Sequence, residues 1–281
     1  MTLTTKKVTL VKLGGAVITN KEIPNQLRPE VLDRLVREIA RAYKEQPDMC
    51  LVLGNGVGSY AHVPAAHYQT MNGFINDESR IGMAITQDSA AQINREVVKA
   101  CLRHEIPAVT VAPSNSLLTR DRKASSYFTD VFEEYMRLGL LPVTYGDVIV
   151  DQAQGCTIWS TDKVLAFFAQ EFTKNGWEVE SIIHVTEAAG VWQMQNGEWL
   201  LNDDGSKRIY DSINPSMRDE VKQSMSSIKG FDVTGGMWHK IEESLALTEI
   251  GITTRIVSGL QKDSLYNALL QVSDSGTVIT R

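Results

Sequence analysis

The chain has 281 residues and a formal net charge of −6 at pH 7, and 43% of its residues are hydrophobic. This length and apolar content are enough for one large α/β domain or for two lobes. The acidic balance, without a basic stripe, argues against a general nucleic-acid-binding protein. The first residues lack the apolar segment of a signal peptide, and no stretch is apolar enough to cross a bilayer. We therefore expect a cytoplasmic protein with neither a nucleic-acid nor a membrane partner.

The three cysteines, Cys50, Cys101 and Cys156, are far apart and lie in or beside apolar runs. An odd number at such spacing predicts neither a disulfide framework nor a zinc site. We expect all three to be core residues.

Apolar runs that end in glycine turns alternate with helical patterns along the first half of the chain. Residues 8–13 predict a strand that ends at Gly14 and Gly15, and residues 49–53 predict a strand that ends in a glycine-rich turn from Gly54 to His62. The other predicted elements are a helix over 28–43, a long helix or two helices over 77–103, a strand over 107–111, a helix over 128–138, and one strand or a hairpin over 141–151, turning at Gly146-Asp147.

The second half continues in the same style. A helix over 161–172, capped by Ser160 or Thr161, precedes a strand over 181–186. The polar stretch 193–230 predicts an exposed hairpin or flap and then a helix from about Ser216. A helix after Met237 and strands over 254–257 and 276–279 close the chain. Repeated strand–helix–strand units predict an α/β fold, a three-layer αβα sandwich with a mostly parallel central sheet.

The turn from Gly54 to His62 is the stretch around which the other motifs are arranged. Glycines at alternate positions bring backbone N–H groups close to a ligand, which suits an anion with several oxygens. A tight turn without a ligand explains the same residues. Since ligands of open α/β sheets bind beyond the carboxyl ends of the strands, we expect the glycine turns to meet at one edge of the sheet.

Four stretches of the chain carry family motifs. They are Lys12-Leu13-Gly14-Gly15 with Lys21 nine residues after Lys12, Gly56 to His62, Pro142 to Asp151, and Asp232-Val233-Thr234-Gly235-Gly236-Met237 with Lys240. Together they resemble the amino acid kinase superfamily, and within it the isopentenyl phosphate kinases, from about residue 8 to the end of the chain. The resemblance implies ATP with Mg²⁺, and we expect a homodimer. It divides one continuous domain into an acceptor-phosphate-binding lobe, 1–178, and a nucleotide-binding lobe, 179–281.

The chain departs from the family pattern at several positions. Asn55, Val57 and Ala61 replace a histidine and two glycines, and Val57 is strained if its position requires a positive φ. Thr186-Glu187-Ala188-Ala189-Gly190 stands where the family has Thr-Asp-Val-Asp-Gly. Ser160-Thr161-Asp162 stands where the family has a Ser-Gly-Asp turn. Two acidic groups on the nucleotide side are therefore altered.

Phosphoryl transfer requires positioned cations and N–H groups around the moving phosphoryl oxygens. We predict that Lys12 and Lys240 contact this group. The resemblance implies that Asp162 holds the lysines, although an N-cap role explains Asp162 equally well. His62 is predicted to hold the acceptor phosphate, as an alternative to a structural role. His67, His104, His184 and His239 have no such setting. The remaining assignments, which include no metal ligand, are Gly56, Val57, Gly58, Ser59, Gly146 and Asp147 for the acceptor, and Gly14, Gly15, Lys21, Thr186, Glu187, Gly190, Gly235 and Gly236 for the nucleotide.

Three functions are compatible with these residues. The first is ATP-dependent phosphorylation of isopentenyl phosphate, or a similar alkyl monophosphate, to the diphosphate. The second is a kinase of the same fold that acts on a fosfomycin-like phosphonate or an amino acid. The third is a non-catalytic protein that binds a nucleotide or an oxyanion. An apolar helix face with Ile81, Met83, Ile85 and Ile93, preceded by Phe74, would line a pocket for a prenyl tail, but a plain core face explains it too.

Overall fold

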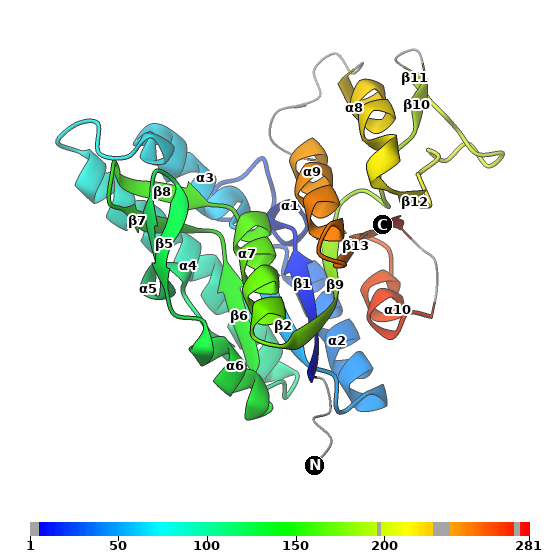
Figure 1. Ribbon diagram of the computed structural model, residues 1–281, viewed down its shortest axis with the longest axis horizontal. Helices are drawn as coiled ribbons and strands as arrows, with labels where there is room; N and C mark the ends of the chain where they lie inside the picture. Colours follow the sequence, from blue (N-terminus) through cyan, green and yellow to red (C-terminus); the bar gives the residue numbers. More distant parts are fainter. Residues whose placement is uncertain (1–5, 196–197, 227–236, 273–275) are drawn as a thin grey trace.

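The computed structural model describes residues 6–195, 198–226, 237–272 and 276–281. In these residues eight strands form the central sheet in the order β12-β14-β13-β9-β1-β2-β6-β3 (Figure 1). All neighbouring strands are parallel except β13 and β14. Their bounds are β1 Lys6–Leu13, β2 Leu51–Asn55, β3 Ala108–Thr110, β6 Leu141–Tyr145, β9 Trp177–Thr186, β12 Ser212–Ile213, β13 Thr253–Ser258 and β14 Thr277–Ile279. The predicted α/β fold with a mostly parallel sheet is confirmed.

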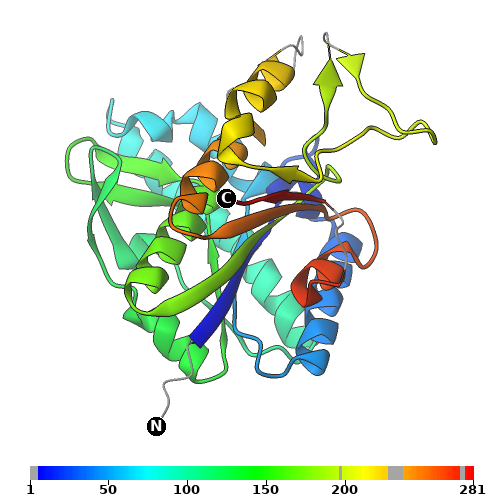
Figure 2. The same ribbon diagram turned by 45° about the vertical axis from the view of Figure 1, so that its right-hand side comes forward.

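Helices cover both faces of this sheet (Figures 1 and 2). One core contains Val11 and Leu13 of β1 with the apolar sides of α2, α4 and α10, whereas Val8 and Leu10 pack with α6, α7 and α9 on the opposite face. Alternate residues of β1 therefore serve different layers, as the period of a strand requires. The helix bounds are α1 Gly15–Ile18, α2 Pro29–Glu45, α3 Gly58–His67, α4 Ser79–Arg103, α5 Pro113–Ser116, α6 Asp130–Arg137, α7 Thr161–Lys174, α8 Arg218–Ser226, α9 Met237–Thr248 and α10 Ser264–Leu270.

A second sheet lies beside the first, in the order β5-β4-β7-β8 (Figure 1). Its strands are β4 Leu117–Arg120, β5 Lys123–Tyr127, β7 Asp147–Asp151 and β8 Gly155–Trp159. The alternatives of one strand or a hairpin over 141–151 are both wrong. The chain leaves the central sheet at Gly146, so that β6 and β7 belong to different sheets. β7 pairs with β8 instead, in an antiparallel register that runs from Asp147–Trp159 to Asp151–Gly155.

The polar stretch after β9 folds over the carboxyl end of the sheet (Figure 2). The short strands β10 Met194–Gln195 and β11 Glu198–Trp199 are antiparallel, which agrees with the predicted hairpin. A 3₁₀ turn, Pro215–Met217, leads into α8, close to the expected helix start at Ser216. The predicted lobe boundary at 178 falls inside β9, so the residues on either side of it share one sheet. In the described part of the chain, no helix has the length and apolar character to cross a membrane.

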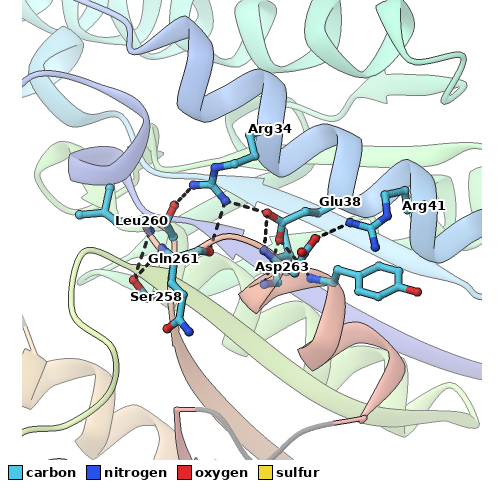
Figure 3. Close-up of polar contacts among 10 residues, drawn as sticks. Arg34, Glu38, Arg41, Ser258, Leu260, Gln261 and Asp263 are labelled. Carbon is cyan, nitrogen blue, oxygen red and sulfur yellow. Dashed lines mark hydrogen bonds and ion pairs between the residues drawn. The ribbon is translucent and has the colours of Figure 1, made fainter. Parts of the chain in front are cut away.

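A buried carboxylate joins α2 to the segment that follows β13 (Figure 3). Glu38 is 2% exposed and accepts hydrogen bonds from Arg34 and from the backbone N–H groups of Asp263, Leu265 and Tyr266. These N–H groups lie at the start of α10, where a helix leaves donors without intrahelical partners. Arg34 also donates to the carbonyl oxygens of Gly259 and Gln261. Glu38 therefore supplies the cap of a helix 225 residues further along the chain.

Candidate active site

The centre of the site is a row of residues across the carboxyl ends of three parallel strands. Lys12 of β1 lies between His184 of β9 and Gly54 of β2, its direct partners in the sheet. The three residues point to the face that α7 covers, because Leu10 and Ile182, two positions earlier on their strands, pack against α7. The close packing of α7 against β2 requires a glycine at position 54, because a Cβ there would lie 2.8 Å from the side chain of Thr161. The first turn of α7 thus sits directly above Lys12.

Asp162 in this first turn collects the cations. Ser160 is the N-cap of α7, since its side chain accepts a hydrogen bond from the N–H of Lys163. The capping role considered for Asp162 is therefore wrong. Asp162 Oδ2 pairs with Lys12 Nζ and lies 3.4 Å from Lys240 Nζ of α9. The side chains of Lys12, Asp162 and Lys240 are only 8%, 13% and 16% exposed. The structure thus brings together the two lysines and the aspartate that the sequence predicts.

His184 belongs to this cluster, although the sequence pattern gave it no functional setting. Its Nδ1 lies 3.2 Å from Asp162 Oδ1, and its side chain is 6% exposed. Neither atom has a hydrogen-bond partner among the described residues. The sequence did contain one signal for His184, which is its position close to the end of a buried strand. His184 stands two residues before the end of β9, and Lys12 stands one residue before the end of β1.

Burial and charge shift the pKa values of this cluster in opposite directions. Burial lowers the pKa of Lys12 to about 8, despite the favourable charge of Asp162. Burial alone would raise the pKa of Asp162, but the Lys12 and Lys240 ammonium groups and His184 hold it well below its usual range. Burial also lowers the pKa of His184. Asp162 is therefore ionised, and it faces two largely buried cations. A second carboxyl group, Glu243 of α9, also acts on Lys12, and burial raises the pKa of Glu243.

The glycine turns pack against each other beside this cluster. A Cβ on Gly15 would lie 2.4 Å from the N of Gly58, and a Cβ on Gly56 would lie 2.5 Å from the N of Gly15. Gly58 has φ of +50°, whereas Val57 has φ of −80°, so the positive φ of this loop falls on a retained glycine. Val57 is therefore not strained. The glycines allow two phosphate-type loops to approach within backbone contact.

Two cavities open on either side of Lys12. The larger, about 580 Å³, lies toward the second half of the chain, and the smaller, about 380 Å³, lies between α3, α4 and β7–β8. Both are lined by Lys12, Gly15, Ala16, His62 and Lys240. The two spaces thus meet at the predicted catalytic lysines and at His62.

The larger cavity contains the predicted nucleotide side. Six of the residues predicted for it line this cavity, whereas Gly235 and Gly236 lie outside the described residues; the six are Gly14, Gly15, Lys21, Thr186, Glu187 and Gly190. Lys21 forms an ion pair with Glu187, which also lies 3.4 Å from Arg28. The lining of the cavity also includes aromatic and thioether side chains, namely Trp192, Trp199, Met194, Met225 and Met237.

The smaller cavity contains the predicted acceptor side. Five of the six predicted residues line it: Gly56, Val57, Gly58, Gly146 and Asp147. Ser59 is buried instead, and its N–H donates to Thr19 Oγ1. Asp147 accepts hydrogen bonds from the N–H groups of Ser114 and Val148, and burial raises its pKa. Burial lowers the pKa of His62, and the positive charge of Lys12 lowers it further.

The apolar wall of the smaller cavity differs from the expected one. α4 contributes Thr86 and Ala90, and the other apolar or aromatic lining residues include Met71, Ile158 and Trp159. Ile81 is 54% exposed, and Ile93 is part of the core between α4 and the sheet. The alternative in which Ile81, Met83, Ile85, Ile93 and Phe74 line the pocket is thus wrong. The other alternative, a core face, holds for Ile93 but not for Ile81, Ile85 and Phe74, which are exposed. The reason is helical phase: α4 turns the face with Thr86 and Ala90, one turn apart, toward the cavity.

Potential metal ligands do not gather in the described part of the chain. No group of three or more His, Cys, Asp or Glu side chains is arranged there to hold a metal ion. The acidic side chain at the centre, Asp162, already faces two lysines.

Comparisons with known proteins identify the family of this chain. Residues 7–258 match the model of the amino acid kinase family. An isopentenyl phosphate kinase of Methanothermobacter thermautotrophicus is 30% identical over 96% of this chain and 98% of its own length, and one of Methanocaldococcus jannaschii is 27% identical over 94% and 95%. A crystal structure of an isopentenyl phosphate kinase aligns with a TM-score of 0.77 at 28% identity, over 97% of this chain and all of that one. This chain therefore belongs to the amino acid kinase family, and its resemblance to the isopentenyl phosphate kinases is confirmed.

Proposed function

We propose that this protein transfers the γ-phosphoryl group of ATP to isopentenyl phosphate, or to a similar alkyl monophosphate, and forms the diphosphate. One observation carries the proposal: two cavities of different character meet at Lys12, His62 and Lys240. A donor phosphate entering from one side and an acceptor phosphate from the other would both reach the same cations. Such positioned charge is the main requirement of phosphoryl transfer.

The character of each cavity supports the assignment of donor and acceptor. The larger cavity is lined by Lys12, Lys21 and Lys240 as well as by Trp192 and Trp199, and this combination suits the phosphates and the base of a nucleotide. In the smaller cavity, His62 stands near an apolar and aromatic wall. A phosphate group on a short hydrocarbon tail matches this pairing of a polar end and an apolar end.

The apolar wall also decides between alternative acceptors. An amino acid presents an ammonium group and a carboxylate, and both would need partners when they are buried. Two acidic residues line this cavity: Asp147 uses its carboxylate oxygens on backbone N–H groups, and Asp162 faces Lys12 and Lys240. An alkyl monophosphate makes no such demand, and this favours it over an amino acid. A non-catalytic binding protein is disfavoured by the buried arrangement of Lys12, Asp162 and Lys240.

Mg²⁺ would enter this site together with the nucleotide. This ion binds through substrate phosphates and water, with one or two carboxylates at most, so the absence of a cluster of metal-ligating side chains in the described residues is compatible with it. When bound, it would neutralise part of the phosphate charge. The residues of this chain would supply the remainder through Lys12, Lys21 and Lys240. A homodimer and a cytoplasmic location stay predictions.

The experiment that tests the proposal is a measurement of ADP release from ATP and Mg²⁺ with isopentenyl phosphate, other alkyl monophosphates, fosfomycin and glutamate. We expect the highest kcat/KM with isopentenyl phosphate or another alkyl monophosphate, and a new diphosphate signal by ³¹P NMR. A preference for glutamate or fosfomycin would contradict the choice of acceptor. Tight ATP binding without turnover of any acceptor would contradict catalysis.

A further inference from the structure

We infer that His184 is a positioning residue: its imidazole donates a hydrogen bond from Nδ1 to Asp162 Oδ1 and so fixes the plane of the carboxylate that holds Lys12 and Lys240. The kinetic part of this inference rests on the proposed kinase function. The contact itself does not, because it is a relationship between β9 and α7 inside the protein.

The contact is argued from two buried polar atoms that face each other. Asp162 Oδ1 and His184 Nδ1 are 3.2 Å apart, and both are without a hydrogen-bond partner among the described residues. A buried polar group that stays unpaired loses its hydration without compensation. The terminal torsion of an aspartate side chain has broad minima, so a small rotation aligns Oδ1 with an Nδ1–H. Each atom is thus the available partner of the other.

The charges around the imidazole require its neutral form. The ionisable groups that face it are Asp162 of α7, Lys12 of β1 and Lys240 of α9. On the remaining side, its neighbour in the sheet is the apolar Ile256 of β13. A protonated ring would add a third positive charge beside Lys12 and Lys240, and Asp162 is the one carboxylate among the groups that act on the ring. A neutral ring with its proton on Nδ1 satisfies Asp162 Oδ1 without this cost.

The two carboxylate oxygens of Asp162 have different partners, and this has a consequence for the lysines. Oδ2 carries both Lys12 and Lys240, and Oδ1 faces His184. If Oδ1 is fixed, the direction in which Oδ2 presents the two ammonium groups is fixed as well. A carboxylate that is free to rotate would let the ammonium groups move away from the point where the two cavities meet. His184 would therefore act on catalysis through Asp162 without touching either substrate.

The first test is a spectroscopic measurement on the wild-type protein. Long-range ¹H–¹⁵N correlation with ¹⁵N-labelled histidine distinguishes the two neutral tautomers, and the signal that His184→Asn loses identifies His184 among the five histidines. We expect the proton on Nδ1 at pH 7.5. A ring with its proton on Nε2 and a bare Nδ1 would overturn the inference. This result does not depend on which acceptor the protein uses.

The second test compares two substitutions with a packing control. His184→Leu removes the donor at similar volume, whereas His184→Asn keeps an N–H donor near the position of Nδ1. Ile182→Val, on the same face of β9, removes one methyl group without touching a polar contact. We expect kcat of His184→Leu to fall on the order of 10-fold or more, the effect of one hydrogen bond to a charged group, while the KM values for ATP and acceptor change little.

We further expect His184→Asn to retain most of the wild-type kcat and Ile182→Val to resemble the wild type. Wild-type kcat in His184→Leu would overturn the inference. Equal losses in His184→Leu and His184→Asn would also overturn it, since the ring would then act through packing alone. If His184→Leu does not fold, the tautomer and the activity of His184→Asn still decide. If the wild type releases no ADP with any acceptor, the proposed function fails, and the tautomer alone decides about the contact.

Discussion

Lys12 and Asp162 form an ion pair that joins the central strand β1 to the first turn of α7, and both side chains are largely buried. The pair holds an ammonium group at the end of the strand before any substrate arrives. Lys240, at 3.4 Å from the same carboxylate, adds a second cation from α9. Because the donors are already in place, the site would stabilise a developing anion without reorganising during the reaction.

The first prediction concerns these two lysines. Lys12→Ala and Lys240→Ala should each lower kcat by roughly 100-fold or more, the usual loss when one preorganised donor to a developing anion is removed. Steady-state ADP release with isopentenyl phosphate measures the effect. Lys99→Ala is the control, because Lys99 lies on the exposed side of α4, where it pairs with Glu96. Losses of only about tenfold in both site variants would refute the assignment.

The second prediction concerns His62, which lines both cavities. His62→Ala should lower kcat/KM for isopentenyl phosphate by roughly 10- to 150-fold, the worth of one hydrogen bond to a charged group. The dissociation constant of ATP should change much less. His62→Gln should recover part of the activity, since an amide is a neutral donor, as is the imidazole with its lowered pKa. An unchanged kcat/KM in His62→Ala would leave His62 with a structural role.

The third prediction follows from the lowered pKa of Lys12, about 8 in the protein without substrates. Because kcat/KM reports the free enzyme, it should fall as the pH rises through about 8 and the ammonium group loses its proton. Bound phosphates favour the charged form, so the corresponding fall in kcat should occur at higher pH. The profile of Lys12→Arg decides, because a guanidinium stays charged throughout. A fall near pH 8 that persists in its residual activity would have another origin.

The fourth prediction concerns stability. Glu38→Ala removes the carboxylate that pairs with Arg34 and caps α10, and it should lower the free energy of unfolding by about 3 kcal/mol. Glu30→Ala changes an exposed carboxylate on the same helix and should stay within about 0.5 kcal/mol of the wild type. Urea denaturation followed by circular dichroism measures both. A loss in Glu38→Ala that is no larger than that of Glu30→Ala would show that the network contributes little.

Much of the fold was predictable because local patterns determine it. The strand that ends at Leu13, the helix of residues 28–43 and the strand that ends before Gly54 follow from apolar period and glycine positions, and α4 proved to be a single helix. The sheet of β4, β5, β7 and β8 was not predicted. Lys123–Tyr127 contains lysine and serines and is largely exposed, so it gives no apolar signal. Its strand pairing depends on tertiary contacts that a single segment does not encode.

Site residues that belong to a sequence motif could be predicted. Residues that join the site only through the three-dimensional fold were missed. Lys12 and Lys240 were found because they stand beside glycine turns within family motifs, and Asp162 was found from the resemblance to the amino acid kinases. His184 was not, because its relationship to Lys12 exists only through the pairing of β1 with a strand some 170 residues later. The prediction of the residues that line the acceptor pocket failed for a related reason. The sequence shows that α4 is apolar on more than one face, but it does not show which face meets the cavity.

The position of β1 in the middle of the sheet has a consequence for synthesis on the ribosome. One edge of β1 pairs with β2, which follows soon after it, but the other edge waits for β9. At ordinary rates of translation this edge stays open for roughly ten seconds. The strand contains Val8, Leu10, Val11 and Leu13, which are all fully buried in the finished sheet. The unpaired edge of such an apolar strand is a template for pairing with another chain. The nascent protein is therefore exposed to aggregation until residue 186 has emerged, and a fragment that ends at residue 178 would stay in that condition.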